Sequence, residues 1–271
     1  MKIIVMIKQV PETSEVKMDE QTGTMVREGV ESIINPLDLY AIETGISLKE
    51  QYGGQVTVIT MGPAKAERAL REALAMGCDD GILICGKEFA GSDTVATSYV
   101  LAQAVKAVGA FDLVLAGERA TDGDTGQVGP MVAALLNLPL STYTSSIMKI
   151  DHNVITAERL VEEGYEVLKL PMPALLTVVK EISFPRLPSL RGKQQAKRKE
   201  LPLWTAESMN LEKEKLGLGG SPTRVVKIEH PKVLRQGQIY RVTDEETLDE
   251  AMDQLEKFLS AQKLIDKEGK G

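Results

Sequence analysis

The sequence is poor in the residues that most often carry catalysis or bind metals. Its 271 residues include two cysteines, Cys78 and Cys85, which are too few for a disulfide framework or a four-cysteine metal site. The two histidines, His152 and His230, lie far apart and share no motif, so we expect no zinc site, no histidine-based triad and no catalytic residue of that kind. Because none of these side chains transfers hydride, any redox role requires a cofactor.

Aromatic residues, positive net charge and long apolar runs are also scarce. Aromatic residues make up 4% of the chain and the net charge is −7, which argues against a nucleic-acid partner. No apolar run approaches the ~20 residues that cross a bilayer. The apolar stretch at residues 3–7 is shorter than the roughly 7–15 residues of a signal-peptide core. We therefore expect a cytoplasmic protein with no membrane insertion.

Short apolar segments alternate with helical patterns over the first 180 residues. The apolar segments are continuous and rich in β-branched residues, as in strands that are buried on both faces of a parallel sheet. The expected strands are residues 3–7, 56–60, 81–85 and 112–116, and the expected helices are residues 36–49, 63–76, 94–108 and 127–136. This order predicts an α/β fold with a Rossmann-like, doubly wound and mostly parallel sheet.

The chain after this alternating region is organised differently. Residues 145–151 and 154–161 are predicted to form a hairpin, and residues 174–179 a further strand, all at an edge of the same sheet. Residues 217–222, which are rich in glycine, predict a flexible linker. Residues 243–264 predict an amphipathic helix with Thr243 as its N-cap.

These patterns divide the chain into three expected parts. The first is an α/β domain at residues 1–184, and the second is a basic loop with a linker at residues 185–222. The third is an extended C-terminal arm at residues 223–271, which ends in the amphipathic helix. A terminal helix beyond a linker has no sequence-adjacent partner for its apolar face. We therefore expect it to dock on another protein or on the first domain.

The most informative segment is the glycine-rich stretch at residues 117–130, which follows a predicted core strand and opens a helix. Open α/β sheets bind ligands at such positions. Glycines allow close approach of the backbone, and amides at a helix N-terminus favour phosphate. Because Asp122 and Asp124 would repel a phosphate, we expect an aspartate to bond ribose hydroxyls or cap the helix, while the amides of residues 125–128 take the phosphate. The alternative is an ordinary Asp-Gly turn with an aspartate cap.

Three other segments are expected at the same edge of the sheet. Residues 7–11 and 60–63 follow predicted strands, and residues 35–38 begin a predicted helix. Taken alone, each is equally well explained as a strand exit or a helix cap. Three such segments at one edge favour a nucleotide crevice.

Several motifs together resemble a known family. They include Ile-Lys-Gln-Val-Pro at residues 7–11, Asn35-Pro36, Met-Gly-Pro-Ala at 61–64 and Ala-Leu-Ala-Met-Gly at 73–77. The most specific is Ala-Glu-Arg-Leu-Val-Glu-Glu-Gly-Tyr-Glu-Val-Leu at 157–168, followed by Pro-Ala-Leu-Leu-Thr at 173–177. In order and spacing they resemble the small, or beta, subunit of electron-transfer flavoproteins over nearly the whole chain.

The resemblance implies a heterodimer with a larger alpha subunit that holds a redox-active FAD. The beta subunit would supply the Rossmann-like domain and an arm that embraces the alpha subunit. It would also bind an adenine nucleotide at the edge described above. The residues that the resemblance assigns to the nucleotide are Met6, Asn35, Pro36, Leu37, Asp38, Met61, Gly117, Arg119, Ala120, Asp122, Gly123, Asp124, Thr125, Gly126, Gln127 and Val128.

Two subtypes of this family differ in the nucleotide. Simple electron carriers hold a structural AMP, whereas electron-bifurcating members hold a second FAD. The stretch Asp-Gly-Asp-Thr-Gly-Gln-Val-Gly-Pro at 122–130 resembles the bifurcating form, as do residues 91–97 and 221–223. This resemblance also places Asp93, Thr94 and Thr97 near the flavin. Two positions depart from the usual pattern: Glu118 stands where a basic residue is more common, and Thr121 where an apolar residue is more common.

The bifurcating resemblance implies a reaction and its partners. NADH would donate an electron pair at this flavin. One electron would pass to ferredoxin or flavodoxin, and the other through the alpha-subunit FAD to a dehydrogenase. In the alternative, a non-bifurcating carrier with AMP passes electrons between an acyl-CoA dehydrogenase and a downstream acceptor. A rival from another class is a nucleotide-binding sensor or hydrolase, which would not need the chain after Lys180.

The basic segment at residues 185–199 holds six Lys and Arg residues and no acidic residue. From charge alone it is a solvated face or a docking surface for an acidic protein. It also resembles the family's recognition loop, which docks on acyl-CoA dehydrogenases through one apolar anchor. That resemblance assigns Leu190 as the anchor, flanked by Arg191 and Lys193, with an acyl-CoA dehydrogenase-type or lactate dehydrogenase-type partner.

Overall fold

The computed structural model describes residues 1–12, 31–226 and 237–265. The chain divides into two units, Met1–Lys227 and Ile228–Gly271. In the first unit the strands are β1 (Lys2–Met6), β2 (Gln9–Pro11), β3 (Ser32–Ile34), β4 (Gln55–Met61), β5 (Asp80–Ile84), β6 (Leu113–Gly117), β7 (Leu140–Asp151), β8 (Val154–Val161), β9 (Gly164–Pro171), β10 (Ala174–Val178) and β11 (Leu203–Trp204). Its helices are α1 (Pro36–Tyr52), α2 (Glu67–Met76), α3 (Thr94–Val108), α4 (Val128–Leu136) and α5 (Leu190–Arg198).

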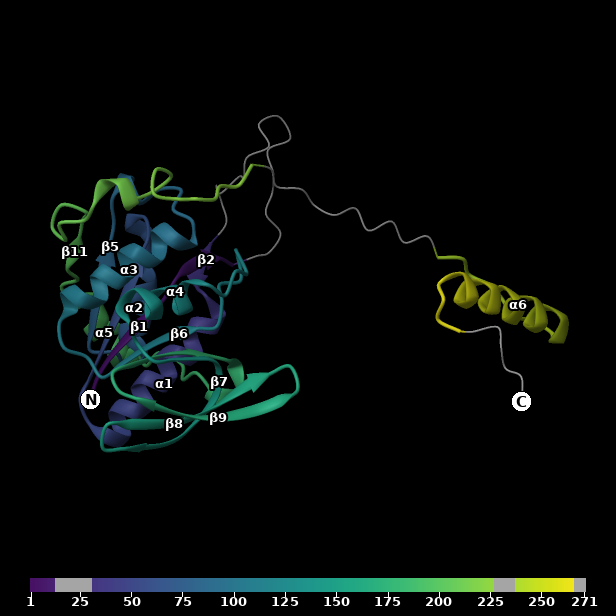
Figure 1. Cartoon of the computed structure of the whole chain (residues 1–271), viewed down its shortest axis with the longest axis horizontal. Coiled ribbons are helices and arrows are strands. Elements are labelled where there is room, and N and C mark those ends of the chain that lie inside the picture. The colour runs from purple at the N-terminus through teal and green to yellow at the C-terminus, as the bar shows by residue number, and fades with distance from the viewer. Residues whose placement is uncertain (13–30, 227–236, 266–271) are drawn as a thin grey trace. The chain divides into compact units, whose positions relative to one another are not determined.

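A nine-stranded sheet forms the centre of the first unit (Figure 1). Its strand order is β11-β5-β4-β1-β6-β10-β7-β8-β9. All neighbouring strands from β11 to β7 in this order are parallel, whereas β8 is antiparallel to both β7 and β9. The small ribbon of β2 and β3 follows the end of β1. The predicted mostly parallel α/β fold is therefore confirmed.

Helices cover both faces of this sheet. Alternate residues of β1 point to opposite faces, as the period of a strand requires. Ile3 and Val5 pack in one apolar core with α1 and α2, and Ile4 and Met6 pack in a second core with α3 and α4. Two such cores are the mark of a doubly wound sheet.

The order of the strands creates a switch point beside β1. From β1 the chain moves outward through β4 to β5, and α3 then carries it back to β6 on the other side of β1. Crossovers in opposite directions leave room between the two strand ends. Ligands of open α/β sheets bind at this place, so the carboxyl ends of β1 and β6 define the candidate site.

The later strands differ in part from the prediction. The hairpin of β7 and β8 forms as expected, but β9 was missed and makes the outer edge of the sheet. The strand predicted at residues 174–179 was expected at an edge, and this was wrong. It forms β10, which lies inside the sheet between β6 and β7, because all five of its residues are buried and need cover on both faces.

The second unit contains the predicted amphipathic helix, α6 (Glu245–Ala261). Its N-cap is Asp244, and not Thr243 as the sequence predicted. The Asp244 carboxylate accepts the Thr247 amide at 2.9 Å, and the Thr247 hydroxyl accepts the Asp244 amide at 3.1 Å, which makes a reciprocal capping box. Across the described residues, we find no helix whose length and apolarity would let it cross a bilayer.

Candidate nucleotide-binding site

Asn35 sits at the N-cap position of α1, but it does not cap the helix. Its side-chain amide donates to the Arg119 carbonyl at 2.8 Å, and its side-chain oxygen accepts the Thr121 amide at 3.2 Å. The residue is fully buried. The predicted N-cap position of Asn35 is therefore confirmed, but its side chain holds the loop that follows β6 and does not cap the helix.

Asp38 lies one turn into α1, with 5% of its surface exposed. Its two carboxylate oxygens accept the Lys8 amide at 2.7 Å and the Gly117 amide at 3.1 Å. Burial raises the pKa of this carboxyl to about 7, although hydrogen bonds from Lys8, Asn35 and Gly117 act in the opposite direction. Asp38 thus connects the end of β1 to the end of β6.

The segment at residues 117–128, called the nucleotide loop below, joins β6 to α4. Ion pairs organise its acidic residues. The Lys8 ammonium contacts the Asp122 carboxylate at 2.7 Å, and the Arg119 guanidinium contacts Asp124 at 3.1 Å. Asp124 has a φ of 52°, and its amide donates to the Ala120 carbonyl at 2.8 Å. Because both aspartates face a cation, their repulsion of a phosphate is reduced.

The N-terminus of α4 closes the loop. Gln127 is its N-cap, and no side chain caps the helix. Gly129 brings α4 close to Thr177 of β10, since a Cβ there would clash with the threonine methyl. The helix thus presents backbone amides and its positive dipole end toward the crevice. The residues of this segment fit a phosphate of an adenine nucleotide, and Gly123, which has open space around it, allows close approach.

The first turns of α3 and α4 lie side by side. The Ser98 hydroxyl contacts the Thr94 carbonyl at 2.6 Å and the Val128 carbonyl at 3.4 Å. Thr94 is therefore close to the end of the nucleotide loop, and Thr97 lies in the same turn of α3. Their proposed place near a flavin remains a prediction that this adjacency supports.

Asp93 has partners within the protein. One carboxylate oxygen caps α3 by accepting the amides of Val95 and Ala96. The other accepts the amide of Thr223 at 3.0 Å and its hydroxyl at 2.8 Å. The Asp93 amide donates to the Ser221 hydroxyl at 2.9 Å, so the end of the segment predicted to be a flexible linker is held against the start of α3. The bonds that the carboxylate accepts lower the pKa of Asp93 below its usual range, despite an opposing desolvation.

The remaining predicted residues lie at the same edge with different exposure. Met6 ends β1 with its side chain buried in the core, and Met61 ends β4 partly buried. Pro36 and Leu37 lie in the first turn of α1, where Pro36 is exposed and Leu37 is half-buried. The residues with exposed positions in the loop are Arg119, Asp122, Gly123, Asp124, Thr125 and Gln127, while Gly117, Ala120, Gly126 and Val128 are half-buried.

Sequence reasoning missed Lys8 as a member of this site. Its backbone pairs with Asp38 and its ammonium with Asp122. A cation directly after a core strand, in a chain whose loop carries two aspartates, was the available signal. Among the residues that the structure describes, no group of His, Cys, Asp or Glu is arranged to hold a metal ion.

A second surface surrounds the basic segment at residues 184–199, called the docking segment below. Its start is extended, as its two prolines predict, but residues 190–198 form helix α5, which was not predicted. Phe184, Leu187 and Leu190 are 95%, 90% and 82% exposed. Arg191 and Lys193 are also exposed. The sequence interpretation gave no role to Phe184 and Leu187, although the spacing of three residues between Phe184, Leu187 and Leu190 was a signal that they belong together.

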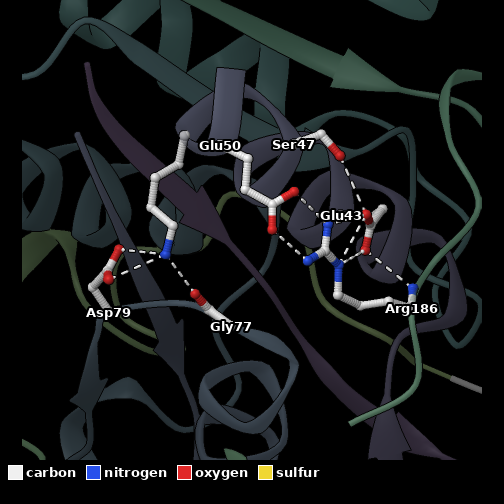
Figure 2. Close-up of polar contacts among 7 residues, drawn as sticks. Glu43, Ser47, Glu50, Gly77, Asp79 and Arg186 are labelled. Atoms are coloured by element: carbon white, nitrogen blue, oxygen red, sulfur yellow. Dashed lines mark hydrogen bonds and ion pairs between the residues drawn. The ribbon is translucent and has the colours of Figure 1, made fainter. Parts of the chain in front are cut away.

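Arg186 attaches the docking segment to α1 (Figure 2). Its guanidinium points between Glu43 and Glu50, with nitrogen-to-oxygen distances of 2.8 Å and 2.6 Å. Its backbone amide also donates to Glu43 at 3.0 Å. Glu50 and Glu43 raise the pKa of Arg186 further above its ordinary value, and the same pairing lowers the pKa of Glu50. Glu43 itself is buried.

Comparisons with known proteins identify the family of the chain. The family model for the electron transfer flavoprotein domain matches residues 22–209. The electron transfer flavoprotein subunit beta of Thermoanaerobacterium thermosaccharolyticum is 45% identical over 256 residues, covering 94% of this chain and 98% of that protein. The subunit beta of Megasphaera elsdenii is 42% identical over 272 residues, covering 98% and 100%. The caffeyl-CoA reductase-Etf complex subunit CarD of Acetobacterium woodii is 43% identical over 266 residues, again covering 98% and 100%.

Proposed function

This chain belongs to the electron transfer flavoprotein family, and from that membership we propose that it is the beta subunit of an electron-bifurcating member. In this proposal the crevice at the ends of β1 and β6 holds FAD, and the chain works in the cytoplasm beside an alpha subunit with its own FAD. The observation that carries the proposal is the nucleotide loop, which joins a core strand end to an uncapped helix N-terminus.

The residues of the crevice have distinct roles in this proposal. The amides of residues 125–128 at the start of α4 hold the phosphates. An aspartate of the loop bonds the ribose, and Thr94 and Thr97 face the flavin ring from α3. When bound, the flavin supplies the redox chemistry by taking an electron pair from NADH and giving it up singly. The protein excludes water and sets the charge around the flavin.

The proposed electron partners follow from the same subtype. One electron goes to ferredoxin or flavodoxin, and the other to the alpha-subunit FAD and a partner dehydrogenase. The printed name of the relative in Acetobacterium woodii places that protein in a caffeyl-CoA reductase complex. This supports an acyl-CoA dehydrogenase-type partner for the present chain, although a lactate dehydrogenase-type partner would use the same surface.

The nucleotide content of the heterodimer tests this function. The chain is co-expressed with its alpha subunit, and the purified complex is denatured so that released nucleotides can be quantified by chromatography. We expect two FAD per heterodimer. One FAD and one AMP would instead identify a non-bifurcating carrier with a structural nucleotide in this crevice.

The docking segment is proposed to bind the dehydrogenase. Exposed leucines next to the exposed basic residues Arg191 and Lys193 suit an anchor that is steered by charge toward an acidic partner. We expect Leu187→Ala and Leu190→Ala each to lower the rate of partner reduction by about tenfold to thirtyfold, in line with roughly 2 kcal/mol for an interface anchor. NADH oxidation with an artificial acceptor should stay unchanged.

A matched control separates docking from general damage. Leu203 of β11 is also exposed, at 59%, but lies outside the docking segment. Leu203→Ala should leave partner reduction unchanged. Equal losses in partner reduction and in artificial-acceptor turnover would reject the docking role of Leu187 and Leu190.

A further inference from the structure

Asp38 bridges two strands at the switch point of the sheet. Its carboxylate oxygens accept one amide from the residues just after β1 and one from the last residue of β6. The fit is close, because a Cβ on Gly117 would lie 2.5 Å from Asp38 Oδ1 and 2.8 Å from the Leu37 carbonyl carbon. Adjacent parallel strands are normally joined only by their own ladder bonds. Here the Asp38 side chain adds a further link between the two strands, through its bonds to the Lys8 and Gly117 amides; this link is called the clasp below.

The carboxylate has little capacity left for a ligand. Each oxygen already accepts one backbone amide, and because 5% of the residue is exposed, its remaining lone pairs are largely shielded from a ligand. A ribose hydroxyl that bonded Asp38 would have to enter a space already filled by the first turn of α1 and two strand ends. Direct contact with a nucleotide, as the family resemblance implied for Asp38, does not suit this position.

The clasp is linked to the start and to the middle of the nucleotide loop. Lys8, whose amide Asp38 binds, extends its ammonium to Asp122 in the loop. Gly117, the other clasped residue, is where the loop starts. Asn35, three residues before Asp38, binds Arg119 and Thr121 in the same loop. Four contacts, made by three residues at the start of α1 and just after β1, therefore fix the loop relative to the sheet.

We propose that Asp38 is a positioning residue that clasps the ends of β1 and β6, sets the geometry of the nucleotide loop and makes no contact with the nucleotide. The nucleotide part of this inference rests on the proposed function, whereas the clasp itself does not. The charged groups at this edge are Lys8 after β1, Glu118 and Arg119 after β6, and Asp122 in the loop.

The state of the clasp should depend on pH. An ionised carboxylate accepts both amides, whereas a protonated carboxyl has a hydroxyl at one oxygen and binds one amide less well. With the pKa of Asp38 raised to about 7, the clasp tightens as pH rises through 7. Nucleotide affinity should rise in the same interval. Folding stability should change in the opposite direction, because the folded protein keeps a proton between pH 4 and 7 that the unfolded chain has lost.

The test uses Asp38→Asn in the full-length heterodimer, after bound nucleotide has been removed. Calorimetry with AMP, 2′-deoxy-AMP and 3′-deoxy-AMP between pH 6 and 8 measures affinity. We expect the variant to bind AMP about tenfold more weakly, with no rise in affinity through pH 7. The loss caused by each missing hydroxyl should be the same in the variant and the native protein. A ribose contact would instead make Asp38→Asn insensitive to one of the deoxy analogues, which would overturn the proposal.

Asp79→Asn is the matched control. The Asp79 carboxylate also accepts a strand amide, that of Val56 at 2.8 Å, but at the start of β4 and thus at the opposite edge of the sheet. It should lower stability without changing AMP affinity or its pH dependence. If Asp79→Asn weakens AMP binding as much as Asp38→Asn, the positioning role is rejected in favour of general destabilisation.

Hydrogen exchange separates this inference from the proposed function. In the nucleotide-free protein, Asp38→Asn should speed exchange of the Lys8 and Gly117 amides by at least tenfold relative to Asp79→Asn. Unchanged exchange at both amides would overturn the clasp. If the native heterodimer bound no AMP, the nucleotide site would be rejected while faster exchange would still establish the clasp.

Discussion

Arg186→Ala is expected to lower the free energy of unfolding of the first unit by about 3 kcal/mol. The substitution removes every guanidinium bond to Glu43 and Glu50 and leaves the Glu43 carboxylate buried without its cation. An uncompensated buried charge is costly because the protein interior solvates it poorly. For a unit of this size the midpoint of thermal unfolding should fall by roughly 6–12 °C.

Urea unfolding followed by tryptophan fluorescence measures this change. Trp204, the only tryptophan in the sequence, lies in β11 and so reports on the first unit. Arg159→Ala is the control, since Arg159 pairs with Glu166 at 2.7 Å on the surface of the β8–β9 hairpin. Exposed pairs of that kind contribute about 0–1 kcal/mol. A loss for Arg186→Ala no larger than that for Arg159→Ala would show that Glu43 is adequately solvated alone.

Gly117→Ala should destabilise the first unit by about 2–3 kcal/mol and reduce nucleotide binding more than tenfold. The added methyl would meet Oδ1 of the Asp38 carboxylate, which is buried and held by two backbone amides, and the backbone of Leu37. Relief requires α1 to move away from the end of β6. That movement would break the bond from the Gly117 amide to Asp38 and displace the start of the nucleotide loop.

Gly123→Ala in the same loop provides the comparison. A Cβ there meets no atom within 4 Å, so the variant should keep its stability. The stability of both variants can be compared by urea unfolding. An equal free energy of unfolding for the two variants would mean that the Gly117 backbone relaxes at little cost. The close fit at the switch point would then contribute little to stability.

The sheet was predictable because its signal is local. Each central strand is a continuous apolar run, and the helices between them carry start and stop residues that follow from backbone sterics. Once the strands were assigned, the position of the nucleotide loop at the end of β6 followed from the rules of open α/β sheets.

The parts that sequence reasoning missed depend on contacts between distant residues. In the sequence Asn35 is typical of a helix cap, but its side chain forms hydrogen bonds with Arg119 and Thr121, which are 84 and 86 positions away. Helix α5 has a polar, basic sequence and forms where Gly192 lets it approach the backbone of Ala75 in α2. Strand β9 is mostly exposed, with Leu170 as its one buried residue, and its pairing with β8 decides its place. Nothing in a single sequence records such partners.

The docking segment is anchored at both ends. Arg186 and Glu43 fix its start on α1, the Arg71 guanidinium contacts the Ala196 and Lys199 carbonyls near its end, and β11 then pairs with β5. A segment held in this way loses little conformational entropy when a partner binds. The exposed leucines would then engage as a rigid template. Under the proposed docking role, association would need no prior ordering step, and the lifetime of the complex would depend mainly on the apolar anchor.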